Sequence, residues 1–235
     1  MIQSHLLQVL ALVVMDPPAT LDAEDVRDRK AEALRACKLW GDDPVSAGRR
    51  ARYSAGTIDG RELPGYADES GVDPSRQTET LAELKLQVDN WRWAGVPFLL
   101  RSGKALGDRR KEIVVTFKGV PRRIPGLSGH ELPTRLRLSL GPDRLALDVN
   151  INGPADPFEI DRVELSAEFA PGRLSAYGEV LAAVFRSDPL LSVRADTAEQ
   201  CWRIVDPVLA AWQQDRVPLE EYPAGSAGPA GWGAI

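Results

Sequence analysis

Apolar residues near both ends of the chain follow patterns that predict helices. The segment 6–15 is almost entirely apolar and is followed by Asp16-Pro17-Pro18, so we expect a buried helix that ends before the prolines. Residues 20–40 place apolar side chains at helical spacing behind acidic ones, which predicts a second helix ending near Trp40-Gly41. Two more helices are predicted at 177–185 and 197–214, and Pro207 in the latter can kink it.

Between these helices the pattern is one of strands. Residues 41–77 are rich in Gly, Pro, Asp and Ser, which predicts mostly loop with one short strand at 50–55. Short runs that favour strands, several with strict alternation of apolar and polar residues, follow at 84–89, 97–101, 112–117, 135–140, 145–151 and 163–169. Gly141-Pro142-Asp143 predicts a hairpin turn between two of them. Because these strands follow one another without helices, we expect antiparallel pairing.

These elements together predict an α+β fold, with helices packed on a large, mostly antiparallel sheet. We expect one domain over residues 1–222, without internal repeats. A Gly/Ala/Pro-rich tail follows over residues 223–235, and its composition predicts a loose conformation.

Composition excludes several classes of function. Of the 235 residues, 43% are hydrophobic and 27% charged, which is typical of a globular protein. The net charge of −5 argues against a nucleic-acid partner. The apolar run at 6–15 is about half the length of a membrane span, so no membrane partner is expected. Two cysteines, Cys37 and Cys201, fit a reducing cytoplasm, and two histidines cannot form a histidine metal cage.

Motifs for nucleotide binding and for nucleophilic catalysis are missing from the sequence. It contains no Gly-x-Gly-x-x-Gly between a strand and a helix and no Walker-type phosphate loop, so we assign no cofactor-binding residue. His5 lies on the apolar first helix and His130 in a predicted loop, and neither is assigned a role. We therefore predict no catalytic residue and no metal ligand.

Residues 89–112 form the segment with the clearest chemistry. Five basic residues fall within eleven positions: Arg101, Lys104, Arg109, Arg110 and Lys111. Lys104 follows Gly103 at the end of a predicted strand, where a lysine and a nearby arginine can grip a phosphate. From the residues alone a solvated basic loop is the favoured alternative. Trp91 and Trp93 are expected to be core or interface aromatics.

The same segment resembles a known family. DNWRWAGVPFLLRSGKAL is similar to DNWRW-x-GVPF-x-x-R-[ST]-GK-x-L, the signature of glucose-6-phosphate dehydrogenases. MIQSHLLQVLALVVMDPP resembles the family's helix M-x-QNHLLQ-x-L…MEPP, with Ser4 in place of the usual asparagine. LPGYADESGVDPSRQTETLAELKLQVDNW resembles the stretch before the signature, although Gln77 shifts the usual SRTET. CWRIVDPVLAAW and PLEEYPAGSAGP resemble the closing helix and tail.

This resemblance implies an enzyme of the oxidative pentose phosphate pathway. Such enzymes oxidise glucose 6-phosphate at C1 to 6-phosphogluconolactone and pass hydride to NADP or NAD. In the family, the lysine of the R-[ST]-GK motif and a basic residue five positions later bind the substrate; these are Lys104 and Arg109 here. The family pairs subunits through its sheet, so a homodimer or pairing with a dehydrogenase subunit is expected, in the cytoplasm.

Two parts of the family pattern have no counterpart in this sequence. These are the nucleotide-binding domain with its glycine fingerprint, and the R-I-D-H-Y-L-G-K-E segment whose histidine takes the C1 hydroxyl proton. The resemblance is therefore to the carboxy-terminal domain alone, and we expect no catalysis by these residues by themselves. Three interpretations stay open: part of a dehydrogenase, a non-catalytic domain that binds a dehydrogenase subunit or a sugar phosphate, and a split enzyme.

Overall fold

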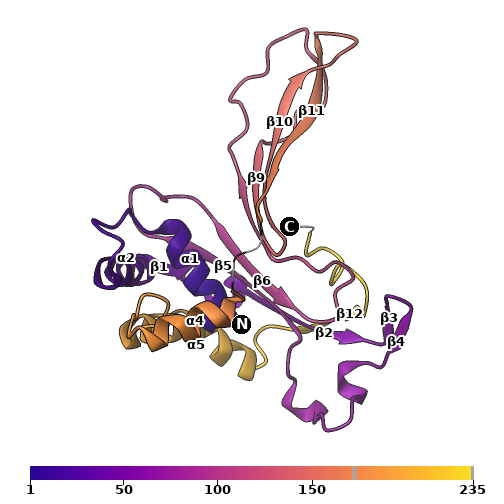
Figure 1. Cartoon of the computed structure of the whole chain (residues 1–235). Helices are drawn as coiled ribbons and strands as arrows, with labels where there is room; N and C mark the ends of the chain where they lie inside the picture. The colour runs from indigo at the N-terminus through magenta and orange to yellow at the C-terminus, as the bar shows by residue number, and fades with distance from the viewer. Residues whose placement is uncertain (171, 173, 234–235) are drawn as a thin grey trace. The chain divides into compact units, whose positions relative to one another are not determined.

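The computed structural model describes residues 1–170, 172 and 174–233, which form two compact units. Unit 1 comprises residues 1–108 and 176–233, and unit 2 comprises residues 109–175 (Figure 1). Helices and a mixed sheet make up unit 1, whereas unit 2 is built on a sheet alone among its described residues. The α+β class expected from the sequence is confirmed.

The sheet of unit 1 is centred on β5. β1 and β2 pair with one edge of β5 and β6 with the other, all antiparallel, and β12 then pairs with β2 in parallel (Figure 1). These strands span Cys37–Leu39 (β1), Gly48–Ser54 (β2), Leu81–Val88 (β5), Phe98–Gly103 (β6) and Leu219–Pro223 (β12). A separate hairpin joins β3 (Gly56–Ile58) and β4 (Arg61–Leu63).

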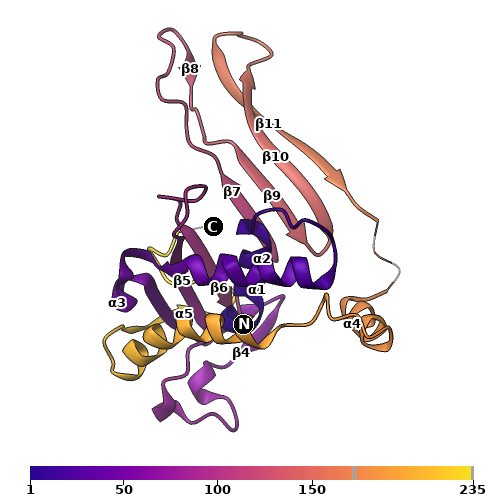
Figure 2. The same cartoon turned by 90° about the vertical axis from the view of Figure 1, so that its left-hand side faces the viewer.

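Helices cover one face of this sheet. A π-helical turn at Ile2–Leu6 leads into α1 (Leu7–Val14), and α1, α2 (Ala23–Ala36) and α5 (Ala195–Gln213) lie together against the strands (Figure 2). The remaining helices are α3 (Pro44–Ala47), α4 (Ala176–Phe185) and 3₁₀ turns at Trp40–Asp42, Tyr66–Asp68 and Pro74–Arg76. α5 continues through Pro207.

The alternation of side chains along β5 creates two hydrophobic clusters. Leu84, Leu86 and Val88 point into the cluster formed with the helices. Leu81 belongs to a second cluster on the opposite side, with Ala51, Tyr53, Tyr222, Ala224 and Trp232. Cys37 lies in the first cluster, where burial raises the pKa of its thiol to about 12, so it packs as a small hydrophobe.

Unit 2 has one five-stranded sheet, in the order β7-β9-β10-β11-β8. Its strands span Glu112–Thr116 (β7), Ser128–Gly129 (β8), Arg135–Leu140 (β9), Asp143–Asn152 (β10) and Glu159–Glu168 (β11). All pairs are antiparallel except β11 with β8. Leu140 pairs with Asp143, which confirms the expected hairpin. The described strands thus form two five-stranded sheets and the separate β3–β4 hairpin, rather than the single large sheet that we expected.

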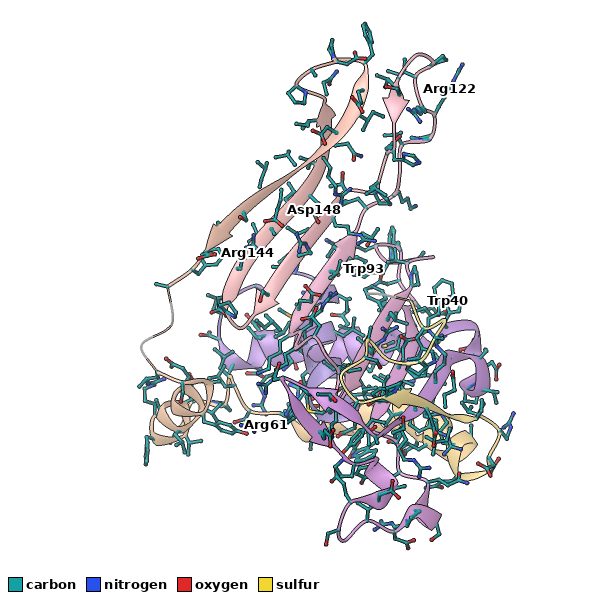
Figure 3. The ribbon with its side chains drawn as sticks, turned by 90° about the vertical axis from the view of Figure 1, so that its right-hand side faces the viewer. Trp40, Arg61, Trp93, Arg122, Arg144 and Asp148 are labelled. Atoms are coloured by element: carbon teal, nitrogen blue, oxygen red, sulfur yellow. The ribbon has the colours of Figure 1, made fainter. Side chains whose placement is uncertain are left out.

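Opposite faces of the unit 2 sheet differ sharply in polarity. Arg144 and Asp148 project from alternate positions of β10 (Figure 3). Asp148 pairs with Arg137 at 3.1 Å, and Glu164 pairs with both Arg137 and Arg144. The intervening positions carry apolar side chains, such as Leu147 on β10. One face is therefore a network of ion pairs and the other is apolar.

Two expected elements differ in the structure. The second helix ends at Ala36, because Cys37, Lys38 and Leu39 pair with β5 instead of continuing the helix. Arg203 donates to the carbonyls of Leu34 and Cys37 at 2.9 Å, which satisfies the helix end. Residues 41–77 also contain more than a loop and one strand, since α3 and the β3–β4 hairpin form there.

Of the tail expected at 223–235, Pro223 belongs to β12 and residues 224–233 are not loose, so the expectation is wrong for these residues, whereas 234–235 lie outside the described residues. Ala224 and Trp232 are only 4% and 5% exposed. The indole N–H of Trp232 donates to Glu220 at 2.8 Å, and Arg101 donates to the Trp232 carbonyl at 2.7 Å. Composition misled the prediction because glycines permit close packing of backbones as well as flexibility.

Candidate functional site

Lys104 lies on a short loop that begins where β6 ends. Its backbone N–H donates to the Thr80 carbonyl at 2.9 Å, which extends the β5–β6 ladder by one residue. Ala105 then turns the chain with a φ of +52°, and Leu106 packs against the second cluster. The side chain of Lys104 is exposed, and among the residues that the structure describes none forms an ion pair with it. The loop thus presents, from a fixed backbone, an ammonium group that has no ion-pair partner in the described part of the chain.

A buried hydroxyl relay supports the Lys104 backbone. The Tyr222 hydroxyl donates to the Lys104 carbonyl at 2.7 Å and lies 3.0 Å from the Thr80 hydroxyl. The Tyr53 backbone N–H donates to that same Thr80 oxygen at 2.9 Å. Burial raises the pKa of Tyr222, which keeps its hydroxyl protonated and able to donate.

The chain after β12 holds the rest of the loop. The Gly225 N–H donates to the Ala105 carbonyl at 2.8 Å, and the Gly107 N–H donates to the Ser226 carbonyl at 2.9 Å. A Cβ on Gly107 would lie 2.2 Å from the Gly225 carbonyl oxygen, so a side chain there cannot fit without displacing the backbone. Gly225 itself has a φ of +85°, in the region that glycine adopts without strain. Two backbones therefore meet here at a distance that requires glycine.

An ion-pair cluster fixes this C-terminal segment to the sheet. Glu83, on β5, is 2% exposed and pairs with both Arg49 and Arg101. The two guanidinium groups lie 4.8 and 5.8 Å from the centre of the Trp232 ring. Arg101 also donates to the carbonyl of Gly233 at 3.0 Å. This cluster anchors the segment that in turn supports the Lys104 loop.

The basic residues singled out in the sequence therefore have different surroundings. Arg101 is largely buried and structural. Lys104 belongs to unit 1, whereas the exposed Arg109 is the first residue of unit 2. Arg110 lies 3.6 Å from Glu112 in unit 2, and Lys111 accepts a backbone hydrogen bond from Leu140. Of the five, Lys104, Arg109 and Lys111 are exposed and form no ion pair with the described residues, and among these three Lys104 alone belongs to unit 1.

The tryptophans and histidines considered in the sequence analysis also differ in their burial and contacts. Trp93 packs against the first cluster and donates to the Val14 carbonyl at 3.0 Å, as expected of a core aromatic. Trp91 is 99% exposed and is not a core residue. His5 and His130 are both exposed, and neither lies within the Lys104 loop.

A cavity of about 460 Å³ lies elsewhere in unit 1. It is lined by residues that include Arg50, Gln77, Trp212 and Asp215. Arg50 is its buried charge, but that guanidinium already donates to the Val217 carbonyl at 3.0 Å and to Asp215 at 2.9 Å. The buried guanidinium of this cavity is therefore already satisfied by protein partners.

The described residues do not fit a dinucleotide cofactor. The N-cap residues of α2, α3 and α5 are Asp22, Asp43 and Arg194, so none of these three helices opens with a glycine-rich turn after a strand. The part of the chain that the structure covers also contains no cluster of three or more metal-ligating side chains. None of its helices is long and apolar enough to cross a membrane.

Sequence reasoning missed Tyr222, Thr80 and the glycines that hold the loop. The sequence did contain a signal for the glycines. Residues 103–107 read Gly-Lys-Ala-Leu-Gly and residues 224–228 read Ala-Gly-Ser-Ala-Gly, and these two glycine-containing segments contact each other in the structure. However, the pairing of these two segments, more than one hundred residues apart, depends on the parallel β12–β2 register and not on local pattern.

Comparison with known proteins supports a single family. The family model for the glucose-6-phosphate dehydrogenase C-terminal domain matches residues 1–234. Glucose-6-phosphate 1-dehydrogenase of Mycolicibacterium smegmatis is 41% identical, over 97% of this chain and 48% of its own length. The Treponema pallidum enzyme is 37% identical, over 97% of this chain and 46% of its own. The chain thus spans about half the length of the curated relatives it matches.

Solved structures agree with this result. The crystal structure of glucose-6-phosphate 1-dehydrogenase from Mycobacterium avium has 36% identity and a TM-score of 0.79, covering 97% of this chain and 46% of that one. A glucose-6-phosphate dehydrogenase in complex with its substrate, glucose-6-phosphate, gives a TM-score of 0.85 at 28% identity, covering 98% and 48%. With the family model matched from end to end of the described fold, the chain belongs to the glucose-6-phosphate dehydrogenase C-terminal domain family.

Proposed function

We propose that this domain is the sugar-phosphate-binding part of a glucose-6-phosphate dehydrogenase and that Lys104 binds glucose 6-phosphate. The observation that carries this proposal is an exposed ammonium group, without an ion-pair partner in the described part of the chain, on a loop whose backbone is fixed on both sides. A lysine in this setting supplies a point charge and up to three hydrogen-bond donors to phosphate or sugar oxygens.

Arg109 is the second substrate residue in this proposal. It follows Lys104 by five residues and is exposed. Its guanidinium can bind two oxygens of one phosphate group, which a lysine cannot do in the same fork geometry. The assignment of Arg109 rests on the family motif.

The proposed reaction oxidises glucose 6-phosphate at C1 and transfers hydride to NADP. The described residues do not fit the dinucleotide, so the role of this chain is to hold and orient the sugar phosphate. Two buried free cysteines accord with a cytoplasmic location.

We further propose that the domain pairs with a second dehydrogenase subunit through a sheet. The apolar face of the unit 2 sheet supports this, because Leu140 and Leu165 on it are 51% and 57% exposed. Large exposed apolar side chains on one sheet face are typical of a protein interface. Light scattering of the purified chain is expected to give twice the monomer mass, and a strict monomer at micromolar concentration would contradict this pairing.

A titration of the purified chain tests the proposed function. We expect glucose 6-phosphate to shift the amide resonances of residues 103–107 in two-dimensional ¹H–¹⁵N NMR spectra, with an affinity on the order of millimolar, because only two residues of this chain are proposed to contact it. Glucose without phosphate is the matched ligand control and should shift them far less. Inorganic phosphate separates general anion binding from sugar-phosphate binding. Unchanged resonances at tens of millimolar glucose 6-phosphate would refute the proposal.

A further inference from the structure

We infer that Tyr222 is a positioning residue for Lys104, and that its hydroxyl sets the direction in which the Lys104 side chain leaves the loop. This inference rests on the proposed function, in which Lys104 binds the sugar phosphate. Tyr222 is fully buried, lies on β12 and does not itself reach solvent, so it acts through Lys104 and not on the substrate.

The hydrogen-bond geometry gives the relay a single direction. A carbonyl can only accept, so the Tyr222 hydroxyl must donate its one proton to the Lys104 carbonyl. The Thr80 hydroxyl must therefore donate to the Tyr222 oxygen, at 3.0 Å. Thr80 can do so because its oxygen accepts from the Tyr53 backbone N–H at 2.9 Å. Each donor and acceptor of the relay is thus used once, in order.

Thr80 consequently holds Lys104 from two sides. Its carbonyl accepts the Lys104 N–H directly, at 2.9 Å, and its hydroxyl holds the Lys104 carbonyl through Tyr222. Fixing both the N–H and the C=O of one residue fixes the orientation of its Cα–Cβ bond. The regular β5–β6 ladder ends at Gly103, so the side-chain hydroxyl replaces the strand neighbour that Lys104 lacks.

Loss of the Tyr222 hydroxyl should affect the loop more than the fold. The ring would keep its place in the second cluster, where it meets the Tyr53 ring at 6.4 Å. The Lys104 carbonyl would lose a buried partner, and the residue would have to turn to find water or another donor. The ammonium group would then occupy several positions, which lowers affinity for a fixed phosphate.

Four variants of the full chain test this inference by the NMR titration with glucose 6-phosphate. Tyr222→Phe removes the hydroxyl and Thr80→Val breaks the relay one step earlier, whereas Thr80→Ser retains it. Tyr53→Phe is the matched control, since it removes a tyrosine hydroxyl that bonds Glu69 and leaves the backbone N–H in the relay. Exchange of the Lys104 amide with solvent deuterium, measured without ligand, reports on the loop independently of binding.

The expected result is a three- to tenfold higher dissociation constant, roughly, for Tyr222→Phe and Thr80→Val. Both variants should also show faster exchange of the Lys104 amide. Thr80→Ser should restore wild-type affinity, and Tyr53→Phe should leave it unchanged, which a general loss of stability would not do. Wild-type affinity in Tyr222→Phe would overturn the inference while leaving the proposed function intact. A wild-type chain that does not bind glucose 6-phosphate would overturn both.

Discussion

Replacing Glu83 by glutamine is expected to lower the free energy of unfolding by about 3–5 kcal/mol. The Glu83 carboxylate is 2% exposed and is shared by Arg49 and Arg101. Glutamine has the same shape, but its amide group turns N–H donors toward guanidinium donors and leaves the buried Arg101 charge uncompensated. Breaking a buried ion pair at one partner is costly for this reason, even where the intact pair contributes little.

Urea unfolding followed by circular dichroism measures this change. Glu221→Gln is the matched control, because Glu221 is 64% exposed and lies 3.7 Å from Arg52, a distance and exposure at which an ion pair contributes about 0–1 kcal/mol. A loss below about 1 kcal/mol in Glu83→Gln would show that the buried arginines find water or other partners. The variant should also loosen the segment around Trp232, visible as faster amide exchange at Gly225.

Replacing Lys104 by alanine is expected to weaken binding of glucose 6-phosphate at least tenfold, which corresponds to about 1.4 kcal/mol. A hydrogen bond from a charged donor to a phosphate oxygen contributes about 1.5–3 kcal/mol. The substitution removes the ammonium group but not the backbone contacts, since both are made by the main chain. The fold should therefore be unaffected.

The measurement is the dissociation constant from the NMR titration, compared with that of Lys38→Ala. Lys38 is also exposed and basic, but its ammonium group is paired with Asp89 at 2.7 Å, and that pair raises the pKa of Lys38. Removing it changes the net charge by the same amount without touching the Lys104 loop. Equal weakening in both variants would show that binding depends on overall charge, and Lys104 would lose its assignment.

The helices and strands were largely predictable from local pattern. The first helix, the strands near 84–89 and 135–140, and the hairpin at 141–143 all follow from spacing within a few residues. The early end of α2 did not follow, because it depends on Cys37–Leu39 pairing with a strand almost fifty residues later. For Cys37–Leu39 the strand pairing with β5 is more favourable than continuing the helix, so tertiary contacts override local helix propensity.

Prediction of the site was limited in a different way. The sequence identified Lys104 as a candidate because glycine and basic residues are local signals. It could not separate Arg101 from Lys104, since the difference lies in a buried carboxylate from β5 and a tryptophan from the far end of the chain. The support of the loop by Tyr222 is likewise visible only once β12 has been placed beside β2.

The parallel pairing of β12 with β2 also has a consequence for the order of events during protein synthesis. Residues 219–232 leave the ribosome after every segment that they contact, including β2, the β3–β4 hairpin and the Lys104 loop. Until then β2 has an open edge and the Lys104 carbonyl lacks its tyrosine. The nascent chain can bury its helical cluster only in part, since α5 also comes late, and the Lys104 loop is completed last. A chain released before residues 219–232 are made would therefore expose the unpaired edge of β2, and the orientation of its Lys104 side chain would not be fixed.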